Sequence, residues 1–285
     1  MKVVLAGACG HLGMEIYRSL LKAGHEVIAA DLIERDPETE GKHTFVKLDV
    51  TKPESLQGLC GGADLVISTV GLTTASKSLT NMQIDYQGNL NLLHEAERAG
   101  VKGFIYISVL KADQAPKVPM LESKHRMEEA LKQSGMPYLI YRPTGYFYDI
   151  VKVFRPMIEK GSVTLLGNAP ISANVIDTPD FADYIVAHLD DRGKTVSIGG
   201  KETYTYEEIA RMCFAAAGKP AVIKHAPAWL FDVLAWFSHV SGNGREAVIR
   251  FSKFTLSQQM VGDVKAGGHS FAEYIRESFA AAEAH

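Results

Sequence analysis

The chain has 285 residues, a formal net charge of −3 and a hydrophobic content of 46%, enough for one large α/β domain with an added lobe or for two small domains. The balanced charge, without a basic block, excludes a nucleic-acid footprint, and no apolar run reaches membrane-spanning length. The cysteines Cys9, Cys60 and Cys213 are far apart and lack metal-ligand spacing, so we expect no metal site and a reducing, cytoplasmic compartment.

The first 31 residues predict a dinucleotide-binding unit. An apolar run at Lys2–Ala6 is typical of a buried strand, and the helix that follows carries an apolar residue at every fourth position. Gly7 permits the tight turn between them, Gly10 lets the backbone approach a pyrophosphate, and Gly13 lets helix and strand pack closely. Asp31 ends the second strand, where a ribose-binding acid belongs.

Strands and helices alternate from the N-terminus to about residue 142. This alternation predicts an α/β fold with a doubly wound parallel sheet of the Rossmann type, whose ligands bind at the carboxyl ends of the strands. The expected strands are Lys2–Ala6, Glu26–Ala30, Thr44–Leu48, Leu65–Val70, Phe104–Val109 and Tyr138–Tyr141, and the expected helices are Leu12–Ala23, Pro53–Cys60, Leu79–Ala99 and Met120–Gln133.

The rhythm changes after Pro143. The later elements that we expect are helices at Val151–Glu159, Pro179–Leu189 and Tyr206–Ala217, β segments at Val163–Leu166, Pro170–Ala173 and Thr195–Ile198, and mostly helix over the last sixty residues. We therefore expect a Rossmann domain over 1–150 and a smaller, mostly helical substrate lobe over 151–285, with segments near 175–200 packing back on the sheet.

One later segment, Ala226–Val240, is apolar enough to lie on a membrane surface. It carries no basic face, so we expect a core or pocket-lining helix. The residues that would line a substrate pocket are Trp229, Phe231, Leu234, Trp236 and Phe237.

Several segments together resemble the atypical short-chain dehydrogenase/reductase superfamily, on its NmrA-like side. The glycine motif GACGHLG (7–13), the segments LDV (48–50) and STVG (68–71), and the long stretches 84–110 and 134–147 carry this resemblance. It continues through 177–185, 198–210 and PAWLFDVLAWF (227–237). The later part is most similar to a subgroup that includes 3,8-divinyl chlorophyllide 8-vinyl reductases.

The resemblance implies a catalytic set made of a Ser or Thr at the end of the fifth strand and a Tyr-x-x-x-Lys helix. Ser108 matches the strand-end position and Lys124 matches the lysine. Met120 stands where the tyrosine would be, and residues 107–137 contain no tyrosine. A thioether cannot exchange a proton, so ordinary alcohol–ketone interconversion would need another proton donor.

Hydride addition to a polarised C=C bond has different requirements. It needs an acceptor held against the nicotinamide and a proton for the carbon, and Lys124 could hold the ribose. Tyr146 is our candidate catalytic donor, with Tyr148 and His125 as alternatives.

The cofactor is expected to be NAD or NADP. Asp31 favours NAD, because its carboxylate accepts from ribose hydroxyls and repels a 2′-phosphate. Leu32 occupies the place of the arginine by which NmrA-like relatives commonly bind NADP, while Arg35 is within loop reach and keeps NADP open. The expected cofactor-binding residues are Gly7, Ala8, Cys9, Gly10, His11, Leu12, Gly13, Asp31, Leu32, Arg35, Asp49, Val50, Thr69, Val70, Gly71, Lys124, Pro143, Thr144 and Phe147.

These features predict an NAD(P)H-dependent reductase, a monomer or homodimer, acting on a hydrophobic, conjugated or aromatic small molecule. One alternative is an NmrA-type sensor that binds the dinucleotide and regulates a partner without turnover; the missing tyrosine favours it, and the retained Ser108 and Lys124 argue against it. A nucleotide-sugar epimerase or dehydratase is a weaker alternative, since those enzymes depend on the tyrosine.

Overall fold

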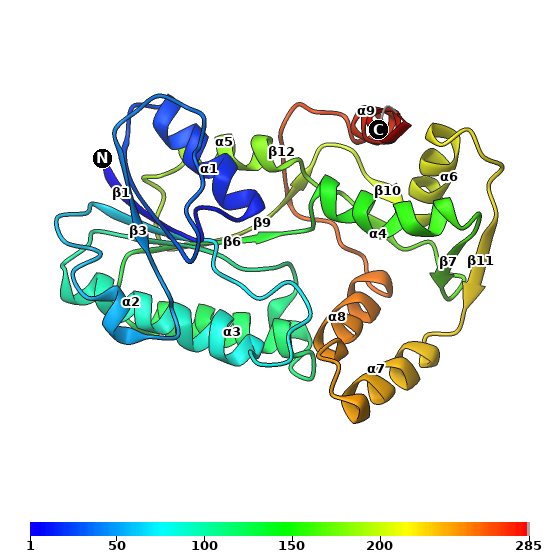
Figure 1. Ribbon diagram of the computed structural model, residues 1–285, viewed down its shortest axis with the longest axis horizontal. Coiled ribbons are helices and arrows are strands. Elements are labelled where there is room, and N and C mark those ends of the chain that lie inside the picture. Colours follow the sequence, from blue (N-terminus) through cyan, green and yellow to red (C-terminus); the bar gives the residue numbers. More distant parts are fainter. Residues whose placement is uncertain (284–285) are drawn as a thin grey trace.

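A parallel sheet of eight strands forms the centre of the protein. The computed structural model describes residues 1–283, and its main sheet has the order β12-β9-β6-β5-β4-β1-β2-β3, with every neighbouring pair parallel (Figure 1). The strands are β1 (Lys2–Ala6), β2 (Glu26–Asp31), β3 (His43–Lys47), β4 (Leu65–Ser68), β5 (Phe104–Ile107), β6 (Tyr138–Pro143), β9 (Lys194–Gly200) and β12 (Val264–Ala266). The strand order reverses between β1 and β4, so the expected doubly wound Rossmann-type sheet is confirmed.

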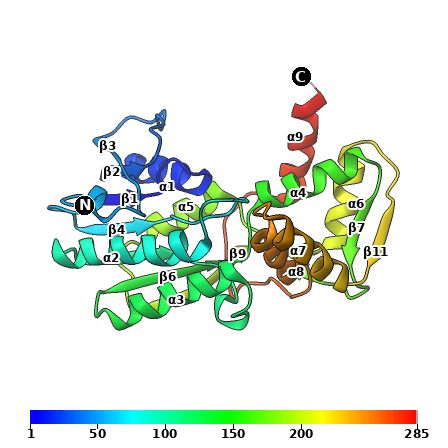
Figure 2. The same ribbon diagram turned by 60° about the horizontal axis from the view of Figure 1, so that its bottom comes forward.

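Helices cover both faces of this sheet. Figure 2 shows α1 (His11–Lys22) and α5 (Thr178–Ala187) on one face, and α2 (Asn89–Arg98) and α3 (Pro119–Gln133) on the other. Each pair of helices encloses its own apolar core against the sheet. The central strands are therefore buried on both faces, as their continuous apolar runs predict.

A third apolar core belongs to the C-terminal lobe. Its elements are the helices α4 (Phe147–Glu159), α6 (Tyr206–Ala216) and α9 (Phe271–Glu283) and two small sheets, β7 (Val163–Leu166) with β11 (Ile223–Ala226) and β8 (Ser172–Ala173) with β10 (Tyr204–Thr205). A hairpin of α7 (Trp229–Ser241) and α8 (Glu246–Leu256) links this lobe to the Rossmann part, since α8 packs against α3. The chain also returns twice to the main sheet, where β9 pairs with β6 and β12 pairs with β9.

Several helices differ from the prediction. The stretch expected as one helix over 79–99 begins as a π-helical turn, Met82–Gly88, before α2. Asn89 explains the change, because its side-chain amide donates to the carbonyls of Ile84 (3.3 Å) and Asp85 (3.0 Å) inside the turn. The segment 53–60 is only a 3-10 turn, Pro53–Leu56, followed by Gly58 at a φ of 79°. Helix α4 begins at Phe147, four residues earlier than expected.

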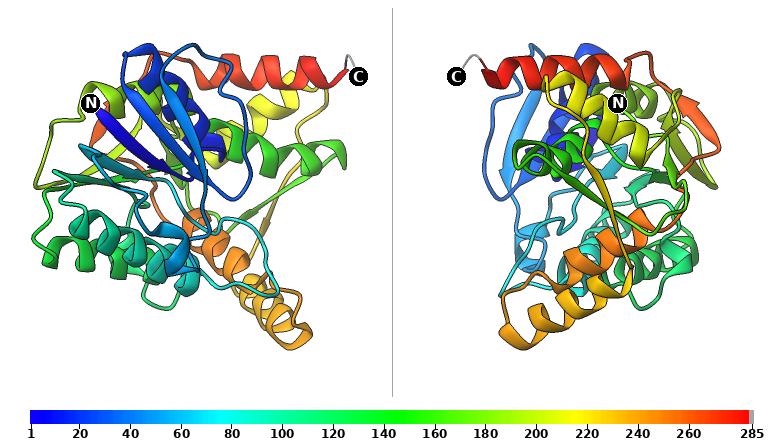
Figure 3. Two further views of the ribbon diagram at one scale, coloured as in Figure 1. Left: turned by 60° about the vertical axis from the view of Figure 1, so that its left-hand side comes forward. Right: turned by 90° about the vertical axis from the view of Figure 1, so that its right-hand side faces the viewer.

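The expectation that Ala226–Val240 is a core or pocket-lining helix is wrong. Helix α7 forms there, but Trp229, Leu234, Trp236 and Phe237 are more than half exposed and Phe231 is half-buried. Only Ala235 and Ser238 of α7 are buried. Figure 3 shows the hairpin of α7 and α8 projecting from the body of the protein. Within residues 1–283, no helix is long and apolar enough to cross a bilayer.

Candidate functional site

The turn between β1 and α1 is closely packed by glycines. Gly7 has a φ of 80°, which side chains rarely adopt. A Cβ on Gly13 would lie 1.9 Å from the Gly7 carbonyl oxygen, so only glycine fits there. Thr69, which follows β4, donates its hydroxyl proton to that same carbonyl at 3.0 Å. The first N–H groups of α1, which have no intrahelical partners, are thereby held at the carboxyl edge of the sheet, where they can bind phosphate.

Asp31 lies against this turn at the end of β2. Its carboxylate accepts hydrogen bonds from the N–H groups of Cys9 (2.8 Å) and Leu32 (2.7 Å), which fixes its orientation. Burial, and then the Asp31 charge, raise the pKa of the Cys9 thiol, while the Arg35 backbone, which contacts the thiol, lowers it. The thiol stays protonated, which indicates a filling role for Cys9. The Leu32 and Arg35 side chains are exposed.

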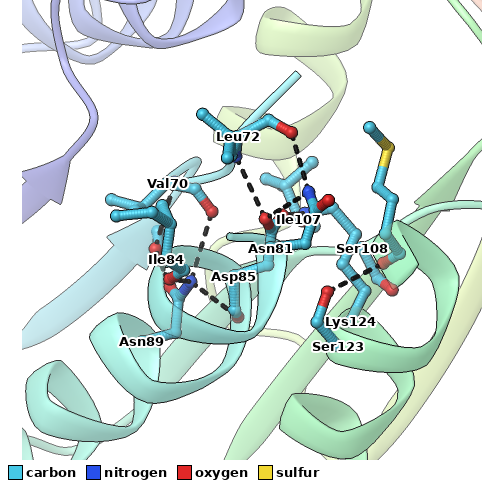
Figure 4. A network of polar contacts seen from close by, with 12 residues as sticks. Val70, Leu72, Asn81, Ile84, Asp85, Asn89, Ile107, Ser108, Ser123 and Lys124 are labelled. Carbon is cyan, nitrogen blue, oxygen red and sulfur yellow. Dashed lines mark hydrogen bonds and ion pairs between the residues drawn. The ribbon is translucent and has the colours of Figure 1, made fainter. Parts of the chain in front are cut away.

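A buried ion pair lies at the same edge of the sheet. The ammonium of Lys124, on α3, lies 3.2 Å from Oδ1 of Asp85, in the π-helical turn, and donates a hydrogen bond to the Ile107 carbonyl at 3.2 Å (Figure 4). The ring of Tyr106 lies below the ammonium at 5.3 Å. Both charged side chains are buried, so each depends on the other for compensation.

The two oxygens of Asp85 have different surroundings. Oδ2 accepts from the Leu72 N–H (3.1 Å) and the Asn81 amide (3.0 Å). Oδ1 is within ion-pair distance of Lys124 but receives no well-directed hydrogen bond from any described residue. A Cβ on Gly71 would lie 2.8 Å from Oδ1 and 3.3 Å from the Lys124 Nζ. The glycine thus leaves an acceptor and a donor side by side, a combination that suits the hydroxyl groups of a ribose.

Asp85 is the main site residue that our sequence reasoning missed. The available signal was the spacing of Asn81, Asp85 and Asn89, three polar side chains four residues apart in a segment that otherwise packs against the core. All three are buried. Asn89 also accepts a hydrogen bond from the Ser68 hydroxyl at 2.5 Å and donates to the Val70 carbonyl at 3.2 Å. These bonds connect the end of the π-helical turn to the end of β4.

Ser108 has a different set of partners. Its hydroxyl donates to Oε1 of Glu128 at 2.5 Å. Arg142, at the end of β6, donates to both oxygens of Glu128 at 2.9 and 2.5 Å and also binds Asp113 at 3.0 Å. These contacts raise the pKa of Arg142 above its ordinary value, with the Glu128 hydrogen bond as the largest cause. The structure therefore joins Ser108 to this second network, whereas Lys124 contacts the neighbouring Ile107 carbonyl.

Met120 lies in the first turn of α3, four residues before Lys124, and is buried. Its carbonyl accepts the hydroxyl proton of Ser123 at 3.1 Å, and its thioether offers no proton. His125 is half-buried, and its Nδ1 has no hydrogen-bond partner among residues 1–283.

Aromatic rings adjoin the glycine turn from the start of α4. Tyr148 stacks on His11 with ring centroids 3.6 Å apart, and Tyr146 stacks on Tyr148 at 6.1 Å and on Phe181 at 6.3 Å. Burial raises the pKa of Tyr146 well above its ordinary value and also raises that of Tyr148. Burial lowers the pKa of His11. Both phenols therefore remain protonated at neutral pH, and burial makes each of them a weaker acid than a free tyrosine.

The remaining expected cofactor residues are engaged within the fold. Asp49 accepts from the N–H (3.1 Å) and the hydroxyl (2.6 Å) of Thr51, and the latter contact is the largest cause of its lowered pKa. Thr144 donates its hydroxyl proton to the Asn174 carbonyl at 2.8 Å. The ring of Phe147 is buried against α9. Val50 and Pro143 are buried, and Val70 is half-buried.

The chain is similar to known proteins over most of its length. The photosystem II assembly factor Ycf39 of Synechocystis sp. is 31% identical over 234 residues, which cover 80% of this chain and 71% of that protein. The divinyl chlorophyllide a 8-vinyl-reductase of Oryza sativa subsp. indica is 27% identical over 267 residues, which cover 82% of this chain and 64% of that protein.

Among solved structures, the NADPH-dependent quinone oxidoreductase QOR2 of Escherichia coli, complexed with NADPH, has the same fold. Its TM-score is 0.70 at 19% identity, covering 98% of this chain and 100% of that chain. The model of the NmrA-like family matches residues 1–270. This chain therefore belongs to the NmrA-like family.

Proposed function

We propose that the protein is an NAD(P)H-dependent reductase of a hydrophobic, conjugated or aromatic small molecule. The observation that carries the proposal is the buried Lys124–Asp85 pair beside Gly71, at the same edge of the sheet as the glycine turn. A buried carboxylate oxygen without a hydrogen bond normally has a partner, and a ligand hydroxyl would supply one.

In this proposal, each part of the edge holds one part of the dinucleotide. The N–H groups after Gly10 bind the pyrophosphate, Asp31 binds the adenosine ribose, and Lys124 with Asp85 binds the nicotinamide ribose. The Asp31 carboxylate favours NAD over NADP. A bound reduced nicotinamide supplies the hydride.

The absence of a tyrosine at Met120 favours a delocalised acceptor. Such an acceptor spreads the charge that hydride delivery creates, so a strong acid close to one oxygen is less necessary. Tyr146 is our proposed proton donor, because its ring stacks on Tyr148, which in turn stacks on His11 at the start of α1, so its hydroxyl belongs to the aromatic cluster beside the glycine turn. Ser108 is placed to position the end of β5 through Glu128. The names of the E. coli quinone oxidoreductase and the rice vinyl reductase describe acceptors of this conjugated kind. We place this reductase, as a monomer or homodimer, in the cytoplasm.

Lys124→Ala tests the proposal, with Arg126→Ala as the control on the exposed face of the same helix. Loss of a charge-assisted hydrogen bond of ~1.5–3 kcal/mol lowers cofactor affinity by about ten- to hundredfold. We expect this loss in an NADH and NADPH fluorescence titration, with a matching fall in kcat/KM for oxidation of the cofactor by quinones. Equal values for wild type, Lys124→Ala and Arg126→Ala would contradict the proposed site.

A dinucleotide-dependent binding protein without turnover is the second candidate. Met120 favours it, and the name of the Synechocystis relative describes an assembly factor. The same titration separates the two candidates: tight cofactor binding that depends on Lys124, without oxidation by any conjugated acceptor, would support this second function.

A further inference from the structure

Helix α7 presents an apolar ridge to solvent. Trp229, Val233, Trp236, Phe237 and Val240 are 59%, 39%, 57%, 58% and 64% exposed. Their spacing of four, three, one and three residues places them on one side of the helix. The buried Ala235 and Ser238 occupy the opposite side. Apolar side chains therefore face water along the whole length of α7.

The area of the ridge suits either a bilayer or a second copy of the chain, so the charges around the ridge decide between them. The five side chains expose roughly 500 Å² together, if an aromatic side chain offers about 150–250 Å². A standard protein interface buries about 800 Å² on each partner, of which about 60% is apolar, so the two apolar areas are similar. The hairpin projects from the body of the protein (Figure 3). A narrow convex ridge suits a deformable apolar phase.

Basic side chains flank both ends of the ridge. Lys224 precedes α7 and Arg245 follows it, and both are exposed. Lys77 is also exposed. It lies close to Arg245, since a Cβ on the neighbouring Gly244 would lie 2.2 Å from the backbone of Ser76 and 3.0 Å from that of Lys77. Across the described part of the chain, none of these three cations forms an ion pair.

The acids of the hairpin are neutralised. Asp232 binds Lys253 at 2.7 Å, and Glu246 binds Arg250 at 2.8 Å. The hairpin therefore presents aromatic residues between unpaired cations, although the whole chain has a net charge of −3. Aromatic side chains favour the membrane interface and cations favour anionic headgroups.

We propose that α7 docks on the surface of an anionic lipid bilayer, with the ridge in the interface and Lys77, Lys224 and Arg245 against the headgroups. The 13-residue helix is about 20 Å long at 1.5 Å per residue, so it lies along the surface. The docking is a property of the hairpin and does not depend on the reductase proposal.

The chain has two tryptophans, Trp229 and Trp236, and both lie on the ridge. The full-length protein is mixed with vesicles of phosphatidylglycerol and phosphatidylcholine, or of phosphatidylcholine alone. We expect a blue shift of tryptophan emission and co-sedimentation with the anionic vesicles only, both weakened by salt. Circular dichroism and thermal melting of each variant check that the fold is intact.

Two sets of variants test the assignment. Val233→Gln with Phe237→Gln keeps both tryptophans and should abolish binding. Lys77→Gln, Lys224→Gln and Arg245→Gln together should lower vesicle affinity by at least about tenfold, as three headgroup contacts are lost. The matched control removes three exposed lysines elsewhere, Lys22→Gln, Lys102→Gln and Lys194→Gln, and should keep the affinity.

Three results would overturn the proposal. The first is an unchanged emission spectrum with anionic vesicles, which would indicate that the ridge binds a groove of a partner protein instead. The second is vesicle binding that the Val233→Gln, Phe237→Gln variant retains. The third is a blue shift that grows with protein concentration without lipid, together with a larger hydrodynamic radius, which would assign α7 to contact between copies.

Discussion

Two buried carboxylates on neighbouring helices show how a single residue can indicate a binding site. Glu128 has both oxygens occupied, by Ser108 and by the bidentate Arg142, so its network is complete within the fold. Asp85 has only Oδ2 fully bonded, while Oδ1 faces the Lys124 ammonium without a directed hydrogen bond. The Glu128 network therefore has a structural role, and the Asp85 pair retains capacity for a ligand.

Replacement of Asp85 should therefore affect both stability and binding. Asp85→Asn leaves the Lys124 ammonium buried without a countercharge, and we expect a loss of about 3–5 kcal/mol in the free energy of unfolding, measured by urea titration. Adding Lys124→Met should recover part of that loss, because the unpaired charge is gone. Cofactor affinity should fall in both variants. A single Asp85→Asn variant as stable as wild type would show that the pair carries no buried charge.

Secondary-structure elements could be predicted where one strong pattern determines them. The buried strands β1, β4, β5 and β6 and the helices α1 and α3 follow from apolar runs and four-residue spacing. The structure has these elements within a few residues of the prediction. The π-helical turn at 82–88 was not predicted, because it depends on Asn89 bonding to carbonyls inside its own segment. Consequently the edge residues Asp31, Gly71 and Lys124 were found from motifs, whereas Asp85 was not.

The glycine turn yields a prediction that separates folding from binding. Gly13→Ala puts a Cβ against the Gly7 carbonyl, so we expect a lower melting temperature and loss of cofactor binding. Gly10 has a φ of −70° and its Cβ would lie 3.4 Å from that carbonyl, an ordinary contact. Gly10→Ala should therefore melt like wild type yet bind the dinucleotide more weakly. A Gly10→Ala variant with unchanged cofactor affinity in a fluorescence titration would show that the pyrophosphate does not bind at this turn.

At the scale of the whole molecule, the chain crosses between its two parts. The three-residue strand β12 returns from the lobe to pair with β9. So short a segment contains no sequence pattern that predicts a strand. The apolar content of α7 likewise says nothing of whether another layer covers it. Since β9 and β12 extend the same sheet that carries the candidate site, the lobe and the Rossmann part are joined through backbone pairing as well as side chains.

The central claim is that the carboxyl edge of this sheet binds a nicotinamide dinucleotide. Isothermal titration of the full chain with NADH and with NADPH tests it most directly. We expect one saturable site per chain. Binding should be tighter for NADH than for NADPH, because the Asp31 carboxylate repels a 2′-phosphate, and Asp31→Asn should reduce this difference in affinity. Absence of saturable binding for both nucleotides would contradict the account.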